Sequence, residues 1–224
     1  MKLTEAKLKQ LIKEVMTEAA KGPADLPDGV FVSVEKHPAE NSYTIRYVNE
    51  EGKNPRKSHG FKGTVVIEEP QLADEYPCLE ALMVSWANAT SGYGPLLYDV
   101  AMEIATQKAG GLVSDRTVVK PPAQKVWRYY LSNRSGEGGD VTVIQLDNED
   151  DYFENGTQDD CLQNIARGTI TGMYDDFTVS PLSKLYKKQP TTLKALGNKL
   201  RVVGFELNFG NEEDEETEQK DLTN

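Results

Sequence analysis

The chain has few of the side chains that most often bind metals or form disulfides. Its 224 residues include 2 cysteines and 2 histidines. Cys78 and Cys161 are far apart and follow no metal or redox spacing, so we expect two reduced thiols in an intracellular compartment. His37 and His59 lie in polar, loop-like contexts. We therefore expect no metal site and no histidine-based hydrolase triad.

Long apolar runs and net positive charge are also missing. No stretch is long and apolar enough to cross a membrane, and the amino terminus lacks the continuous apolar region of a secretory signal. The formal net charge is -11 at pH 7, which argues against salt-driven binding to nucleic acid. We expect a cytoplasmic protein with neither a membrane nor a nucleic-acid partner.

The most informative segment that is present places two glycines between an apolar run and an amphipathic helix. Residues 81–86 predict a buried strand, and apolar residues at helical spacing predict a helix over residues 96–105. The first N–H groups of a helix have no partner within it, and the helix dipole adds positive charge, so this junction can hold a phosphate group. Gly92 and Gly94 let the backbone approach such an anion, and Pro95 suits a first helical turn. A simple tight turn fits the same residues equally well.

Two better-known phosphate-binding motifs do not fit this segment. Leu97 stands where the dinucleotide fingerprint requires a third glycine. No Gly-Lys-Ser/Thr follows, which excludes a nucleotide P-loop.

The elements that follow the glycines suggest a family. A helix ending at Gly110 and Gly111 is followed by an expected strand over 112–114, a helix over 121–131 and a strand over 141–146. From about Ala81 to Leu146, this succession resembles the second half of the GNAT N-acetyltransferases. In that family an R/Q-x-x-G-x-G/A loop binds the pyrophosphate of acetyl-CoA, and the second helix carries an A-x-x-x-Y pattern.

The resemblance implies an acyl-CoA-dependent N-acyltransferase that uses acetyl-CoA and an unknown acceptor amine. The strand around Trp86 would orient the thioester, and the loop would supply N–H groups to the pyrophosphate. The expected cofactor-binding residues are Trp86, Ser91, Gly92, Tyr93, Gly94, Pro95 and Leu96.

The match is incomplete at two chemically important positions. Ala89 replaces the basic residue or glutamine that opens the loop motif, and Trp127 replaces the tyrosine that often protonates the leaving thiolate, although Ala123 matches the family alanine. Tyr129 or Tyr130 could supply the acid through a shifted register, but core packing explains this aromatic stretch as well.

A base for the acceptor amine is harder to assign. Glu80 and Asp115 are the candidates, and a surface role explains each of them as readily. A second hypothesis from another class is a GNAT-like scaffold without turnover that acts as a virion or host-interaction protein. Ala89 and Trp127 favour it.

The first half of the chain fits the same α/β fold. Residues 30–34, 43–48 and 63–68 alternate or run apolar and predict an antiparallel meander. With the later elements, they predict a GNAT-like mixed, mainly antiparallel sheet flanked by helices, in one core domain over residues 28–146.

Residues 1–22 form an expected amphipathic leader helix before this core. They resemble the short leaders of tailed-phage proteins, and Thr17-Glu18-Ala19 resembles a prohead protease cleavage site. The resemblance implies a phage source, packaging in the virion and a capsid or host protein as partner. A helix that packs on the core fits the pattern equally well.

Residues 147–209 form an expected C-terminal extension packed on the core. It opens with an acidic loop in which Tyr152 replaces the glycine of an EF-hand, so we expect a solvated loop rather than a calcium site. Residues 180–188 and 191–197 predict two short helices, and residues 202–207 a closing strand.

Basic side chains of this extension could meet coenzyme A phosphates or balance the acidic loops. They are Lys184, Lys187, Lys188, Lys194, Lys199 and Arg201. The tail over residues 210–224 holds seven carboxylates and one lysine, and we expect it to be disordered.

Overall fold

The computed structural model describes residues 20–55, 61–70, 81–115, 119–146 and 179–209. Several expectations lie outside these residues. They concern most of the leader helix, the candidate base Glu80, both cysteines, His59, the acidic loop that opens the extension and the acidic tail.

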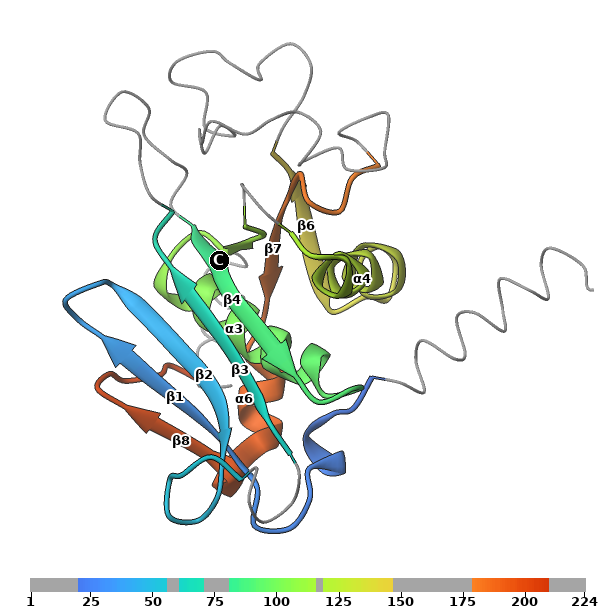
Figure 1. Cartoon of the computed structure of the whole chain (residues 1–224). Helices are drawn as coiled ribbons and strands as arrows, with labels where there is room; N and C mark the ends of the chain where they lie inside the picture. Colours follow the sequence, from blue (N-terminus) through green and yellow to red (C-terminus); the bar gives the residue numbers. More distant parts are fainter. Residues whose placement is uncertain (1–19, 56–60, 71–80, 116–118, 147–178, 210–224) are drawn as a thin grey trace, which may run out of the picture.

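The described residues form one eight-stranded sheet with the order β6-β7-β5-β4-β3-β2-β1-β8 (Figure 1). The strands are β1 (Phe31–His37), β2 (Ser42–Val48), β3 (Gly63–Glu68), β4 (Leu82–Ala89), β5 (Leu112–Val113), β6 (Val141–Gln145), β7 (Lys184–Lys188) and β8 (Leu200–Val203). In this sheet β4–β5 and β1–β8 pair in parallel, and the other neighbours pair antiparallel. The prediction of a mixed, mainly antiparallel sheet is confirmed.

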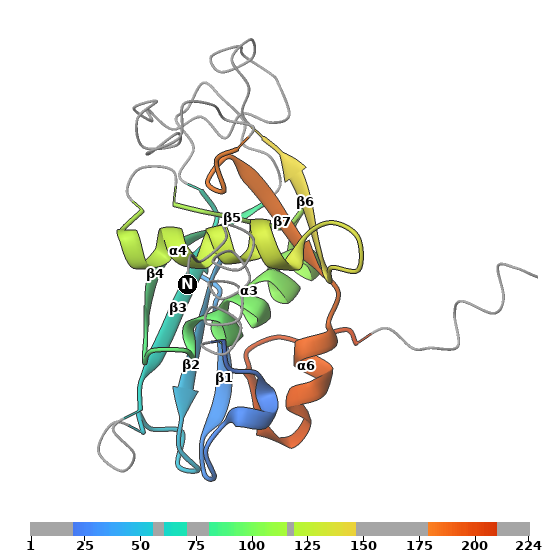
Figure 2. The ribbon, with the colours of Figure 1, turned by 90° about the vertical axis from the view of Figure 1, so that its right-hand side faces the viewer.

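Three α-helices accompany the sheet in the described part of the chain: α3 (Gly94–Lys108), α4 (Pro121–Tyr129) and α6 (Thr191–Leu196). Short turns of 3-10 helix cover Pro23–Asp25 and Gly197–Lys199, and one π-helical turn, Tyr130–Arg134, continues α4. α3 packs on β2, β3 and β7, with α6 beside it (Figure 2). No described helix has the length and apolar character needed to span a membrane.

The core lies between the meander and α3. Inward side chains alternate along β3, where Val65 and Ile67 are buried while their neighbours are half-buried. α3 is buried from Leu96 to Ala105, along both its apolar and its polar positions. Because this stretch of α3 is buried, its carboxylates Asp99 and Glu103 have their partners inside the protein.

The expected helix over residues 180–188 is wrong, because its second half is strand β7. This strand lies between β5 and β6 and completes their backbone hydrogen bonding. The turn before it is fixed by the Tyr186 hydroxyl, which donates to the Pro181 carbonyl at 2.6 Å, and by the Leu182 N–H, which donates to Ser180 Oγ at 3.2 Å. The described part of the extension therefore contributes strands to the central sheet itself.

The other expected elements of the extension are present, with shifted bounds for the strand. α6 confirms the second short helix. The closing strand is Leu200–Val203, which starts two residues earlier and ends four residues earlier than expected, and it pairs in parallel with β1. Phe205, which follows it, packs edge-to-face on Tyr43 at 5.1 Å between ring centroids.

Candidate functional site

The site begins where β4 and β5 separate. The two strands share only the pairs Leu82–Leu112 and Met83–Val113. β5 ends at Val113, whereas β4 continues to Ala89. The far part of β4 consequently has no described strand along this edge, and a wedge opens that side chains of α4 line from the other side.

A β-bulge lies in β4 directly beyond its last pair with β5. Trp86 pairs with Val66 and Val84 with Ile67, so Ser85 is an extra residue in β4. A bulge bends its strand and often lies beside an active site.

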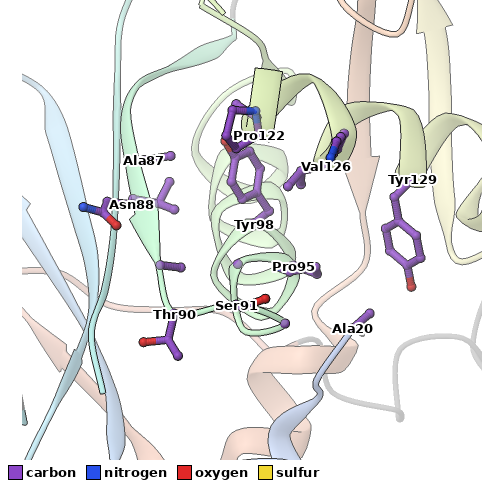
Figure 3. A pocket seen from close by; sticks show the side chains of 16 residues that line it. Ala20, Ala87, Asn88, Thr90, Ser91, Pro95, Tyr98, Pro122, Val126 and Tyr129 are labelled. Carbon is purple, nitrogen blue, oxygen red and sulfur yellow. The ribbon is translucent and has the colours of Figure 1, made fainter. Parts of the chain in front are cut away.

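A cavity of about 590 Å³ occupies the wide end of the wedge (Figure 3). It is bounded by the end of β4, the glycine turn, the first turns of α3 and one face of α4. Its lining includes Ala87, Asn88, Ser91, Gly92, Gly94, Pro95, Tyr98, Ala123, Lys125, Val126 and Tyr129. Most of these side chains are apolar, and the volume lies in the range of small-molecule sites. We call this space the wedge cavity.

The glycine turn presents the start of α3 to the wedge cavity. Gly92 has φ of 83°, a left-handed conformation that glycine adopts without strain. Its carbonyl accepts a hydrogen bond from the Lys21 N–H at 2.9 Å, and no side chain caps the N-terminus of α3. Ser91, Gly92, Gly94 and Pro95, four of the expected cofactor-binding residues, border the cavity.

Two predicted loop residues hold the turn instead of bordering the cavity. The Tyr93 N–H donates to the Thr90 carbonyl at 3.0 Å, and the Tyr93 ring packs on Phe61 at 4.4 Å between centroids. Leu96 is fully buried in the core. Neither residue lines the wedge cavity.

A second cavity, of about 370 Å³, adjoins the first along β4. Both cavities are lined by Ala87, Asn88, Tyr98 and Ala123. The second also reaches Trp86, Asp115, Lys120 and Trp127. Trp86 is 56% exposed, so this space opens to the surface beside an aromatic side chain. We call it the mouth cavity.

Tyr98 of α3 lies where the two cavities meet. Figure 3 shows its ring extending from α3 toward the end of α4 that carries Pro122. Tyr98 is 3% exposed, and its hydroxyl has no hydrogen-bond partner in the described structure. Burial raises the pKa of this hydroxyl, so Tyr98 keeps its proton and remains a donor.

The two expected acid residues, at the end of α4 and the start of the π-helical turn, lie in different surroundings. Tyr129 borders the wedge cavity, and Figure 3 shows its side chain directed away from Tyr98. Tyr130 is fully buried and does not line that cavity. Its hydroxyl lies 2.7 Å from the Pro95 carbonyl and 3.1 Å from Asp99 Oδ1, both of which are acceptors.

Asp99 and Arg134 belong to a network of charges behind the first turn of α3. Arg134 pairs with Asp99 at 3.4 Å and with Asp140 at 2.5 Å. Burial raises the pKa of Asp99 to about 6, although the positive charges of Arg134 and Lys188 oppose this shift. The network fixes α3 against the π-helical turn.

The basic residues of the extension lie away from the two cavities. Lys188 is buried and pairs with Glu103, whose carboxylate also accepts the N–H groups of Thr192 and Leu193, each at 2.7 Å. Lys184 is buried and donates to Gln145. None of the six lines the wedge cavity or the mouth cavity.

Sequence reasoning missed two residues that the fold brings to the site. The sequence predicts only that Tyr98 lies in a helix. Nothing in the sequence indicates that its hydroxyl lacks a hydrogen-bond partner. Lys125 is exposed on α4 and lines the wedge cavity. Lys125 is the fifth residue of α4 and lies 12 residues beyond the end of β5, so nothing in the sequence indicates this proximity.

The remaining candidates are placed as follows. Trp86 and Asp115 line the mouth cavity, and Glu80 is outside the described residues. Within the described part of the chain, no group of three His, Cys, Asp or Glu side chains is arranged to bind a metal ion.

Comparisons of the chain with models of protein families, with curated proteins and with solved structures found no match.

Proposed function

We propose that this chain is an acyl-CoA-dependent N-acyltransferase with a GNAT-like core. The observation that carries the proposal is the pair of adjoining cavities between the uncapped N-terminus of α3 and the wedge between β4 and β5. The order of strand, glycine turn, helix, strand, helix and strand from β4 to β6 supports it.

The lining of the wedge cavity fits the two ends of an acyl-CoA. Ser91, Gly92 and Gly94 lie beside the positive end of the α3 dipole, where a pyrophosphate is stabilised. Lys125 adds a cation on the opposite wall. Between them, Ala87 and Val126 provide an apolar passage for a pantetheine chain.

The mouth cavity is the route that we assign to the acceptor amine. It leads from the exposed ring of Trp86 to Tyr98, and Asp115 lies along it. The amine nitrogen attacks the thioester carbon, the C–N bond forms, and the C–S bond breaks with its electron pair leaving on sulfur. The amine gives up one proton and the thiolate gains one, so the products are an amide and a free thiol. The chain contributes mainly by holding both reactants in contact, which accelerates a bimolecular step without a dedicated base.

A second candidate is a GNAT-like scaffold that does not turn over, with a capsid or host protein as partner. Trp127 favours it, because this side chain occupies the family tyrosine position, is 1% exposed and packs on Tyr98 and Tyr186. Ala89 favours it too, because it offers no side-chain contact to a phosphate. Release of free thiol from acetyl-CoA in a panel of primary amines distinguishes the enzyme from the scaffold.

The ligand site is tested by two substitutions at one glycine. A Cβ added at Gly94 would lie 3.8 Å from Ala89 Cβ, an ordinary contact, so Gly94→Ala leaves the cavity open. Gly94→Trp fills it. We expect acetyl-CoA at about 100 times its Kd to stabilise the wild type and Gly94→Ala by about 2.7 kcal/mol, and Gly94→Trp not at all.

The measurement is the melting temperature of each protein with and without acetyl-CoA. A shift retained by Gly94→Trp would place the ligand elsewhere. No shift in the wild type, with acetyl-CoA or longer acyl-CoAs, would contradict the proposed function itself.

A further inference from the structure

The Tyr98 hydroxyl is a buried polar group without a partner in the described structure. Leaving such a group unpaired is costly, and native proteins contain few of them. Two other side-chain atoms share this property, Gln107 Nε2 and Ser183 Oγ, but neither residue lines the wedge cavity or the mouth cavity. Tyr98 is therefore the one of the three that lies beside these cavities.

The position of Tyr98 indicates which part of a bound ligand its hydroxyl would contact. It lines both cavities, so it stands at the point where a molecule in one meets a molecule in the other. Its ring is held edge-to-face against Trp127 at 5.3 Å between centroids, which fixes the position of the hydroxyl oxygen. A donor that is already desolvated and oriented needs no reorganisation when an acceptor arrives.

We propose that the Tyr98 hydroxyl donates a hydrogen bond to the carbonyl oxygen of the bound acyl thioester. This inference rests on the proposed function, which brings a thioester to the junction of the two cavities. The carbonyl oxygen gains negative charge as the amine attacks, and the hydrogen bond strengthens with that charge. Tyr98 thus recognises the acyl group before the reaction and stabilises the oxyanion during it.

The electrostatics of the site favour Tyr98 as a hydrogen-bond donor over Tyr98 as the acid that protonates the leaving thiolate. Burial raises the pKa of Tyr98, so loss of its proton to a thiolate, whose conjugate acid has a pKa of about 8.5, is unfavourable. The leaving thiolate takes its proton from water, and Tyr98 remains protonated throughout. Tyr130 cannot replace it, because the Tyr130 hydroxyl is already occupied by the Pro95 carbonyl and Asp99.

The test is a comparison of ligand affinities that needs no acceptor amine. Acetyl-CoA carries the thioester carbonyl, whereas S-ethyl-CoA has nearly the same size without it. Titration calorimetry gives the Kd of both ligands for the wild type and for Tyr98→Phe. We expect the substitution to weaken acetyl-CoA binding about five- to tenfold, the effect of one lost hydrogen bond, and to leave the Kd of S-ethyl-CoA within about twofold.

A second readout separates this role from a structural one. Tyr98→Phe removes an unpaired buried hydroxyl and keeps the ring, so we expect the melting temperature of the free protein to stay the same or rise. A lower melting temperature together with equal losses for both ligands would show a packing role and overturn the inference.

The experiment gives different results if this inference fails and if the proposed function fails. If the wild type binds both ligands and Tyr98→Phe binds both with unchanged affinity, the inference is wrong and the proposed function stands. If the wild type binds neither ligand, both are wrong.

Discussion

Tyr98 and Asp99 are successive residues of α3 that face different surroundings. Neighbours in a helix point in different directions, and here Tyr98 points to the cavities while Asp99 points to Arg134 and Tyr130. The Tyr98 hydroxyl has no partner, whereas the Asp99 carboxylate has several. We propose a ligand-binding role for the first, whereas the charge of the second, once buried, lowers the stability of the fold in a pH-dependent way.

Asp99 should make the protein less stable as the pH rises from about 4 to about 6. Its pKa is about 6 in the folded protein, against an ordinary value of 3.8. Between these values the folded state holds more protons than the unfolded state, so raising the pH favours unfolding. The contribution amounts to about 3 kcal/mol once both states are ionised.

Urea unfolding of the wild type and of Asp99→Asn at several pH values checks this expectation. The neutral amide does not titrate, so the free energy of unfolding of the wild type relative to the variant should fall between pH 4 and pH 6. A difference between the two proteins that is constant over this range would show that Asp99 titrates at its ordinary pKa.

At the scale of elements, the misassigned strand β7 shows what local sequence patterns miss. Lys184 and Lys188 are four residues apart and resemble one solvated face of a helix. Both are buried, and the Lys188 ammonium pairs with Glu103, which is 85 residues away in the chain. Strand pairing with β5 and β6, together with this distant carboxylate, overrides the local pattern.

Gly111, where β5 meets β7, should be sensitive to substitution. Gly111 has φ of 148°, and an added Cβ would lie 2.8 Å from both the Tyr186 carbonyl oxygen and Leu185 Cδ1. We expect Gly111→Ala to cost about 3 kcal/mol, because it adds backbone strain to a clash with β7. Gly52→Ala is the matched control. Gly52 has φ of 76°, and an added Cβ would have no atom within 4 Å. We therefore expect Gly52→Ala to cost only the backbone strain, about 1 kcal/mol.

Denaturant unfolding of the two variants measures this difference. Equal losses at Gly111 and Gly52 would mean that β7 does not approach β5 as closely as described here.

At the scale of the whole molecule, the sequence predicts the parts of the fold that depend on local periodicity. The alternation over residues 43–48 and 63–68 places β2 and β3, and the apolar spacing after Gly94 places α3. It does not predict the wedge, which depends on β5 ending after two residues while β4 continues to Ala89. The sequence thus predicts the glycine turn, whereas the cavity beside it and the unpartnered Tyr98 emerge only from the placement of α4 across the wedge from β4.

The most direct measurement is a crystal structure of the protein soaked with acetyl-CoA. The account predicts density for the pyrophosphate against Ser91, Gly92 and Gly94, with the chain of the ligand running between β4 and α4 and its thioester carbonyl at Tyr98. Density at another surface, or an unchanged wedge at saturating acetyl-CoA, would contradict it.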